Sequence, residues 1–495
     1  MAQKRGQRKI HAGLRWVVLA AVGCCTGLVA VGVDTGVSLA FGARDQLVHG
    51  VAGGVRGPRR GPPSAGVASC LALASVAGVL VCFVEPQAAG SGIPEVKCHL
   101  NGIEIPHLLA LRTLLVKAPG VMFSVAAGLP CGKEGPMIHS GACIASVLSR
   151  ACAERLLQPY RPDIEARDLV AAGASCGVAA AFGAPLGGVL FAMEEGASFF
   201  DPDTMLRCFV CCAAATLTTH FFISGVNGWE AWGRMGADGG APASFGRFDQ
   251  SGYRIWELAV FALLGAAGGL LGAAFNSASS AIRRWRLRNV PPRGLPRLLE
   301  VLAITFVVSS VAFVVPAATS EGSAASRLYR APGTDSLRSL SGEGEFDKGG
   351  LLVFGVLYYA MACWTYGAGV PSGLFVPSLL AGAAFGRLAG EALSGPFGLQ
   401  SDVEGTSDAG VYALVGATAL LAGNARITIS LAAILIEASG STLWAVPIFV
   451  TTMCAKWAGD VFNEGSITYR STRTAGLCWK AAQTRTPSLC TRGTS

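Results

Sequence analysis

Long apolar stretches recur along almost the whole chain, and they limit the folds that are open to it. A helix needs about 20 apolar residues to cross the roughly 30 Å hydrocarbon core of a bilayer. Only 14% of the 495 residues are charged, whereas soluble domains carry about 25%. The sequence therefore predicts an all-α polytopic membrane protein. The apolar stretches are 16–41, 67–84, 108–129, 169–193, 205–223, 258–281, 298–315, 351–364, 374–393, 411–436 and 443–457.

Many of these stretches contain glycine or proline, which predicts tilted, broken or only partly crossing helices. Small residues also let helices pack closely in lipid. Residues 173–177 match the G-x-S-x-G pattern of serine hydrolases around Ser175, but they lie in an Ala-rich span. That motif needs a strand, a turn and a helix, together with His and Asp partners. We interpret it, and the glycine cluster at 265–272, as helix packing, and we expect no enzyme.

Charge and cysteine placement suggest the organisation of the chain. The basic segment 1–15 precedes the first span, which predicts a cytoplasmic N-terminus. The arginine run at 283–297 is interpreted as a cytoplasmic loop rather than a nucleic-acid patch, because spans flank it. Most of the 16 cysteines lie in apolar segments, and no Cys/His cluster has zinc-like spacing, so we expect no disulfide framework and no metal site. The expected units are 1–15, a first transmembrane half at 16–240, a second half at 241–469, and a basic tail at 470–495.

An internal repeat relates the two halves. The 132–136 motif, Gly-Lys-Glu-Gly-Pro, aligns with the 373–377 motif, Gly-Leu-Phe-Val-Pro, 241 residues later. Further along, the segment 173–194 aligns with 416–437, and both copies end in glutamate. Chance matches between Gly/Ala-rich segments are the alternative, but the order and spacing of two separate elements are kept. Interrupted segments at corresponding positions of two halves indicate a transporter with its site at the repeat interface.

Three motifs share one design: a glycine that lets the backbone bend, then a proline suited to the first turn of a helix. Each predicts a helix N-terminus within the membrane, with free N–H groups and about half a positive charge. Several such ends at one point make an anion site that binds weakly enough for release. Helix breaks made only for packing are the alternative. The motif residues are Gly90, Gly92, Pro94, Gly132, Lys133, Gly135, Pro136, Gly373 and Pro377, and the expected anion donors are Ser91 through its hydroxyl and Leu374 and Phe375 through their backbone N–H groups.

Acidic residues near these helix starts suggest proton chemistry. A charge at the bilayer centre costs roughly 2.5–3.5 kcal/mol unless it is paired, protonated or lining a cavity. The Glu134 carboxylate can occupy the anion site itself, and protonation would neutralise it and let it swing away. Lys133 either raises the local potential or forms an ion pair, and we assign it no contact with the ion. Glu194 and Glu195 end an apolar span. Adjacent residues point in different directions on a helix, so at most one should face a buried route, and a solvated helix end is the alternative.

The three motifs together resemble the CLC chloride channel/transporter family over roughly residues 15–465. The resemblance implies an inverted repeat of two halves and a homodimer with one pore per subunit. It also implies that Glu134 is the external gate, that Ser91 coordinates chloride, and that Glu195 is the internal proton-transfer glutamate. Ile467 occupies the place of the family's pore tyrosine, with Tyr469 two residues later.

Finer features are similar to the endosomal and lysosomal exchanger branch, among them Lys133 and the run Met-Ile-His-Ser-Gly at 137–141. The resemblance implies a chloride/proton antiporter of an endosomal, lysosomal or vacuolar membrane. The alternatives are a voltage-gated passive chloride channel of the same fold and a truncated, non-transporting subunit. The expected partners are chloride, protons, the lipid bilayer and a second copy of the chain, with any accessory subunit unidentified. The tail lacks the paired CBS domains of eukaryotic relatives, so we expect no cofactor and no nucleotide regulation.

Overall fold

The computed structural model describes residues 2–50, 63–156, 162–196, 202–226, 232–233, 252–318, 324–342, 346–394, 409–463, 465–468 and 470. Within these ranges the regular structure is helical, apart from one isolated antiparallel bridge between Gly132 and Gly373. The all-α prediction is confirmed. The expected tail beyond residue 470 and Tyr469 lie outside the described residues.

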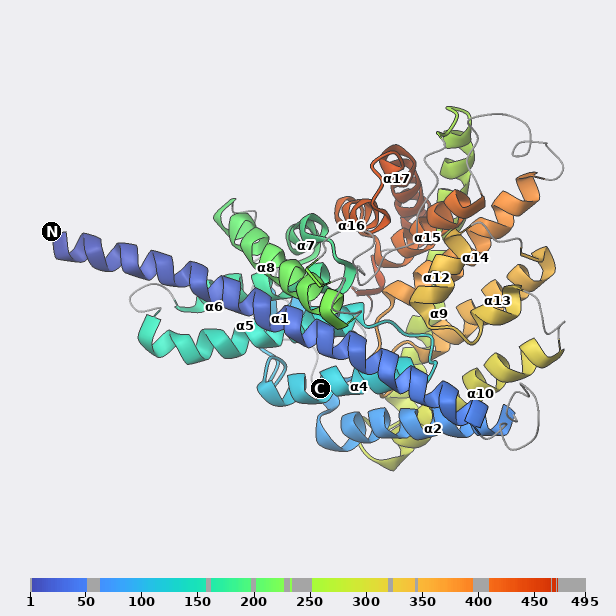
Figure 1. Cartoon of the computed structure of the whole chain (residues 1–495), viewed down its shortest axis with the longest axis horizontal. Helices are drawn as coiled ribbons and strands as arrows, with labels where there is room; N and C mark the ends of the chain where they lie inside the picture. Colours follow the sequence, from blue (N-terminus) through green and yellow to red (C-terminus); the bar gives the residue numbers. More distant parts are fainter. Residues whose placement is uncertain are drawn as a thin grey trace, which may run out of the picture.

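Among the described residues, five helical segments are long and apolar enough to cross a membrane by length and composition: Gly13–Leu47, Ser64–Val84, Pro202–Val226, Glu257–Asn289 and Leu295–Pro316. They lie in α1 (Ala2–Gly50), α2 (Pro63–Val79) with its π-helical end η1 (Leu80–Val84), α8 (Pro202–Val226), α9 (Glu257–Asn289) and α10 (Leu295–Ala318). In Figure 1, α1 runs across the molecule beside α8, and these two helices pack together. The basic run that begins at Arg283 forms the last turns of α9, so the prediction of a loop at 283–289 is wrong.

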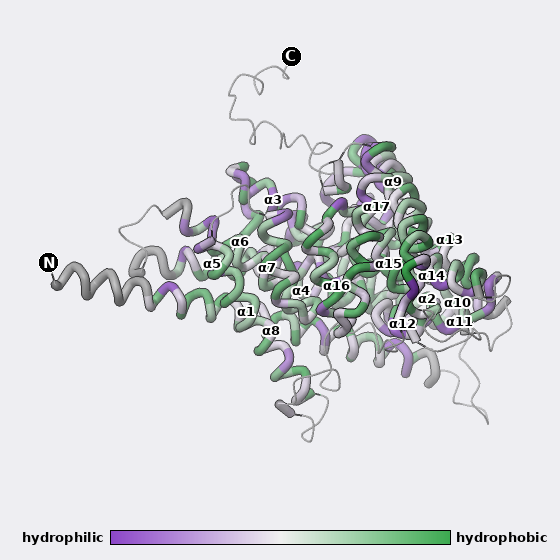
Figure 2. Tube along the Cα trace, turned by 90° about the horizontal axis from the view of Figure 1, so that it is seen from above, coloured by the Kyte–Doolittle hydropathy of each residue, from purple (hydrophilic) through white to green (hydrophobic). Residues whose placement is uncertain are grey.

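Six further helices in the described residues are shorter than these spans. These are η2 (Pro86–Ala88), α4 (Leu111–Ala126), α11 (Ala324–Leu328), α12 (Gly333–Ser341), α13 (Lys348–Thr365) and α17 (Ala445–Phe462). Hydrophobic residues predominate in α15 (Ala409–Ala425) and α16 (Ile429–Ser439) in Figure 2. Short helices that end inside the protein leave polar backbone groups at membrane depth, which is tolerated where the protein itself buries them.

The repeat is visible in the packing of corresponding helix pairs. In the first half α5 (Glu134–Leu156) packs on α6 (Pro162–Phe182), and in the second half α14 (Phe375–Ser394) packs on α15 (Ala409–Ala425). Glycines make both contacts possible. A Cβ atom on Gly173 would lie 2.5 Å from the Cβ of Ala145, and one on Gly416 would lie 2.5 Å from the Cα of Gly386. The packing interpretation of the glycines around Ser175 is confirmed, since that serine lies inside α6 and donates to the Ala172 carbonyl at 2.8 Å.

In each half, the helical segment after the first of these two helices is interrupted, and the interruption falls at corresponding residues. α6 is followed by α7 (Pro185–Phe191) and the π-helical turn η3 (Ala192–Gly196), and α15 is followed by α16 (Ile429–Ser439). The breaks contain Gly183 with φ 68° and Arg426 with φ 59°. A left-handed conformation suits glycine but is uncommon for arginine. Arg426 is held there by its side chain, which donates to the Gly423 carbonyl at 2.7 Å and pairs with Asp460.

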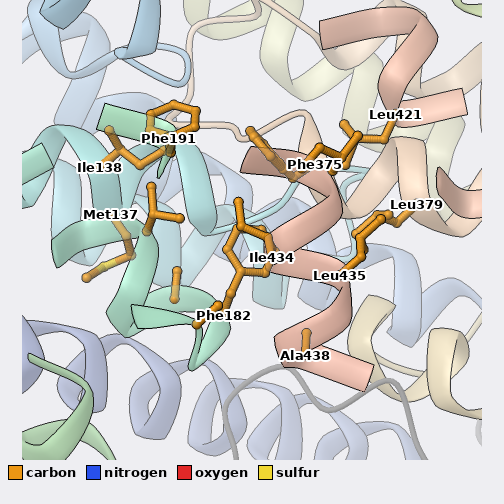
Figure 3. Close-up of a cluster of buried hydrophobic side chains, with 14 of the residues drawn as sticks. Met137, Ile138, Phe182, Phe191, Phe375, Leu379, Leu421, Ile434, Leu435 and Ala438 are labelled. Atoms are coloured by element: carbon orange, nitrogen blue, oxygen red, sulfur yellow. The ribbon is translucent and has the colours of Figure 1, made fainter. Parts of the chain in front are cut away.

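The core joins the two halves. Figure 3 shows side chains of α5, the end of α6 and α7 interleaved with side chains of α14, α15 and α16. The rings of Phe182 and Phe375 lie 5.6 Å apart, and a Cβ atom on Gly187 would lie 2.9 Å from the Cα of Ile434. Tight packing of this kind fixes the helix ends that meet nearby.

Candidate anion and proton site

Three helices begin at one place inside the molecule. α3 (Ile93–Leu100) begins after Gly92, α5 begins at Glu134, and α14 begins at Phe375. The 132–136 and 373–377 motifs are joined directly: Gly132 N–H donates to the Gly373 carbonyl at 3.0 Å, and Gly373 N–H donates to the Gly132 carbonyl at 2.8 Å. The prediction that the two copies of the repeat meet is confirmed.

The 90–94 motif lies against the other two. Gly90 N–H donates to the Val370 carbonyl at 2.9 Å, next to the start of the 373–377 motif. A Cβ atom on Gly135 would lie 2.6 Å from the Cβ of Ser91 and 3.4 Å from the Cα of Gly373. Any larger residue at position 135 would therefore push the three helix starts apart. Their convergence, predicted from the sequence, is confirmed.

The expected anion donors lie at this junction. Ser91 is 7% exposed, and its Oγ accepts a hydrogen bond from Ile93 N–H at 3.3 Å, which leaves the hydroxyl proton free to be donated. Leu374 and Phe375 are buried at the start of α14. The N–H groups of a first helical turn have no acceptor within the helix. This arrangement can receive a small anion without a full positive charge in contact with it.

Glu134 is buried at the same junction. It is 1% exposed, and its Oε2 atom has no hydrogen-bond partner among the described residues. The carboxylate lies next to Gly132 and borders a cavity of about 440 Å³ that Asp34, Lys133 and Val376 also line. A carboxylate that is buried, at a cavity wall and only partly hydrogen-bonded is suited to take up a proton and move.

Lys133 forms an ion pair with Asp34 of α1, with 12% and 18% of the two side chains exposed. The ion-pair alternative for Lys133 is therefore confirmed. The pair keeps the ammonium group neutralised at the cavity wall. The sequence does not identify Asp34, because no local pattern links two residues 99 positions apart.

Glu194 and Glu195, which lie in η3 directly after α7, point to different partners, as predicted. Glu195 is 9% exposed and pairs with Lys97 near the end of α3. Glu194 is exposed, and its carboxylate accepts four hydrogen bonds of 2.7–2.8 Å from the N–H and hydroxyl groups of Thr428 and Ser430. Glu194 therefore caps the N-terminus of α16 in the other half.

The environments of these two acids shift their pKa values in opposite directions. Both lie in η3, outside the five long spans. Burial raises the pKa of Glu195 above the usual carboxyl value, although Lys97 opposes the shift. Burial also acts to raise the pKa of Glu194, but the hydrogen bonds from Ser430 and Thr428 outweigh it and lower that pKa. Neighbouring acids with separated pKa values suit separate roles, one binding a proton and the other staying charged.

Glu437, the repeat counterpart of Glu194, makes the reciprocal contact. Its carboxylate accepts hydrogen bonds from Leu186 N–H at 3.1 Å and Gly187 N–H at 2.7 Å, at the start of α7. Each half thus caps one helix of the other half with a glutamate at a corresponding position. The sequence repeat identified both glutamates but not their targets.

Ile467 lies beside the anion donors. It is 5% exposed and belongs to a buried cluster with Leu374, Phe275 and Cys363. Ile467 therefore presents an aliphatic surface, and no hydroxyl group, next to Leu374. Among the described residues no group of three or more His, Cys, Asp or Glu side chains could hold a metal ion.

A family model and individual known proteins that match this chain point to the same family. The family model described as voltage gated chloride channel matches residues 71–460. The chain is 39% identical over 488 residues to H(+)/Cl(-) exchange transporter 7 of Mus musculus, covering 91% of this chain and 59% of that protein. It is 34% identical over 511 residues to chloride channel protein CLC-c of Arabidopsis thaliana, covering 93% and 63%. The chain therefore spans less than two thirds of the length of these relatives.

Solved structures agree on the fold. A crystal structure of a eukaryotic CLC transporter has a TM-score of 0.72 and 26% identity, covering 94% of this chain and 75% of that one. A slow cyanobacterial Cl⁻/H⁺ antiporter has a TM-score of 0.73 and 23% identity, covering 93% and 98%. The helical arrangement described above is thus shared with these structures over nearly the whole chain.

Proposed function

Because the chain belongs to the voltage gated chloride channel family, we propose that it is a secondary active antiporter that moves chloride in exchange for protons. The observation that carries the proposal is the burial of Glu134 at the junction of three helix N-termini, next to Ser91 and the start of α14. One place in the molecule then serves both ions. Relatives named as H(+)/Cl(-) exchange transporters support exchange over passive conduction.

The chloride step follows from the helix ends. Chloride accepts hydrogen bonds from Ser91 Oγ and from the backbone N–H groups at Leu374 and Phe375. Partial charges of about half a unit bind the ion weakly enough for turnover. The Glu134 carboxylate competes for the same donors when it is ionised. Protonation removes its charge, so chloride enters as Glu134 leaves.

The proton step uses the two buried acids. Glu195 receives a proton from the cytoplasmic side, as its raised pKa favours, and Glu134 exchanges a proton with the cavity of about 440 Å³. Lys97 pairs with Glu195 in its ionised form and holds it in place. The protein thus accepts protons at two separate acids, only one of which lies among the anion donors.

The setting of this activity is also part of the proposal. We place it in an endosomal, lysosomal or vacuolar membrane and in a homodimer with one pore per subunit, as the resemblance of the three motifs to the family implies. Chloride and protons are the transported ions, and the bilayer is the surrounding partner. The proposal requires no cofactor, no metal and no enzymatic step. The described residues are sufficient to bind chloride and to take up and release protons.

Reconstituted vesicles test the proposal. We expect a chloride gradient to drive protons uphill in vesicles that contain the purified chain, as followed by a pH-sensitive dye and a chloride electrode. Chloride flux with no proton movement would instead establish the passive channel. No flux from a dimeric, correctly inserted protein would establish the non-transporting subunit.

A further inference from the structure

Four arginines in the described part of the chain are buried, and one of them differs from the others. Three of these arginines each form a hydrogen-bonded ion pair with a carboxylate. Arg44, which is 6% exposed, has no hydrogen bond to a carboxylate among the described residues. The three paired arginines are Arg286 with Glu300, Arg387 with Glu391, and Arg426 with Asp460.

The contacts of Arg44 satisfy only part of its charge. Nη1 donates to the Ala126 carbonyl at the end of α4 at 3.0 Å, and Nη2 donates to the Arg330 carbonyl at 3.4 Å. The nearest carboxylate belongs to Asp45, which is 3.8 Å away, and 55% of its side chain is exposed. A helix C-terminus supplies only about half a negative charge. A buried charge without a full partner is costly, so this position favours an anion.

Arg44 lines a small cavity between α1, the end of α4, α10 and α13. Its volume is about 60 Å³, several times the roughly 10–15 Å³ that one water needs. Arg330 and Tyr329 line it as well, and no carboxylate belongs to its described lining. Two buried donors here, Arg44 Nε and Tyr329 Oη, have no hydrogen-bond partner among the described residues. A cavity with cationic walls and unused donors is complementary to a small anion.

The small cavity adjoins the larger one that reaches Glu134. The two share lining residues from α1, the end of α4, the segment after α4 and the start of α12: Phe41, Val125, Cys131, Pro332 and Gly333. An ion bound near Arg44 would therefore lie beside the route to Glu134, separate from the junction of the three helix N-termini.

We propose that Arg44 and Tyr329 form a second anion site, which binds a chloride-sized monovalent anion in this side cavity. Asp45 gives Arg44 only a long ion pair with a solvent-exposed carboxylate, without a hydrogen bond. The anion supplies a closer, buried counter-charge, and it accepts hydrogen bonds from the guanidinium group and the Tyr329 hydroxyl. Water alone would satisfy the donors but would add no buried counter-charge. The site does not depend on transport, because the proposal concerns an ion held at equilibrium.

Bromide binding to crystals of the purified full chain tests the site. Anomalous difference density is expected between Arg44 and Tyr329 after soaking in sodium bromide, and no density is expected at Arg286, Arg387 or Arg426. These three arginines serve as controls within the same map. Density at the three-motif junction reports on the proposed transport site independently. An empty cavity at saturating bromide would overturn the proposal, whether or not the protein transports chloride.

Two variants make the assignment specific. R44Q is expected to abolish the density in the side cavity and to leave any density at the junction unchanged. Y329F removes only a hydroxyl that makes no hydrogen bond within the described structure, so it should fold normally. It is expected to raise the half-saturating bromide concentration about tenfold. If Y329F still shows density in the cavity at an unchanged half-saturating bromide concentration, Tyr329 is not a ligand of the anion and the proposed site is wrong.

Discussion

Glu134 begins α5 in the first half, whereas its counterpart in the second half, Phe375, begins α14. The same contrast recurs at the ends of the next spans, where Glu195 corresponds to Ala438. Glu194 and Glu437, by contrast, are acidic in both halves and cap helices reciprocally. The scaffold is therefore repeated, while the acids proposed to carry protons belong to one half. A duplicated fold can position an anion symmetrically and still move protons by an asymmetric route.

The largest expected effect is at Glu134. E134Q keeps the size of the side chain but removes its titration, so chloride flux should become independent of pH and proton movement should fall to background. Paired measurements of chloride and proton flux in vesicles check this result. The matched control is F375L at the corresponding position of the second half, which should retain proton coupling. Preserved uphill proton movement in E134Q would exclude the gating role.

The two glutamates that cap helices of the opposite half, Glu194 and Glu437, should contribute differently to the stability of the fold. E194A removes four hydrogen bonds from the start of α16 and is expected to destabilise the fold by about 2 kcal/mol. E437A removes two from the start of α7 and should cost about 1 kcal/mol. Thermal unfolding of the purified variants measures the difference. Equal midpoints for E194A and the unchanged chain would show that the cap does not hold the halves together.

Removal of the partner of Glu195 should shift the pH dependence of transport. Lys97 lowers the pKa of Glu195 against the raising effect of burial. In K97M that pKa rises further, so Glu195 stays protonated to higher pH. The pH midpoint of the proton transport that Glu195 governs should then move upward. K97R keeps the charge and should keep the midpoint, and a downward shift in K97M would contradict the ion-pair account.

The smallest effect is expected at Ile467. I467Y would offer a hydroxyl at the inner side of the chloride site and should tighten chloride binding about fivefold, since one hydrogen bond contributes about 1 kcal/mol. I467F supplies the ring without the hydroxyl, so it distinguishes the effect of the hydrogen bond from the effect of side-chain size. Chloride titration by calorimetry measures both variants. Equal affinity in I467Y and I467F would place the side chain outside the chloride site.

The sequence predicts those features that depend on local chemistry. Glycine and proline at 90–94, 132–136 and 373–377 mark helix starts, and the structure begins α3, α5 and α14 there. The repeat predicts that the second and third motifs meet, because equivalent breaks in two halves lie at one interface. The divergence of Glu194 and Glu195 follows from the angle between adjacent helical residues.

What the sequence does not predict depends on distant partners. Asp34 and Lys97 neutralise Lys133 and Glu195, but both lie about 100 positions away from the residue they pair with. The left-handed turn at Arg426 has no local signal either, because glycine holds the corresponding place in the first half. Only the packed helices bring Asp460 close enough to fix that arginine.

The most direct test of the asymmetry is proton movement in vesicles that contain E195Q. This variant keeps the size of the side chain and removes its charge, and Glu134 and the anion donors are unchanged. A chloride gradient should drive protons uphill in the unmodified chain, and in E195Q it should move chloride with little proton movement. Equal chloride-driven proton movement in both proteins would contradict the assignment of the proton route to the first half.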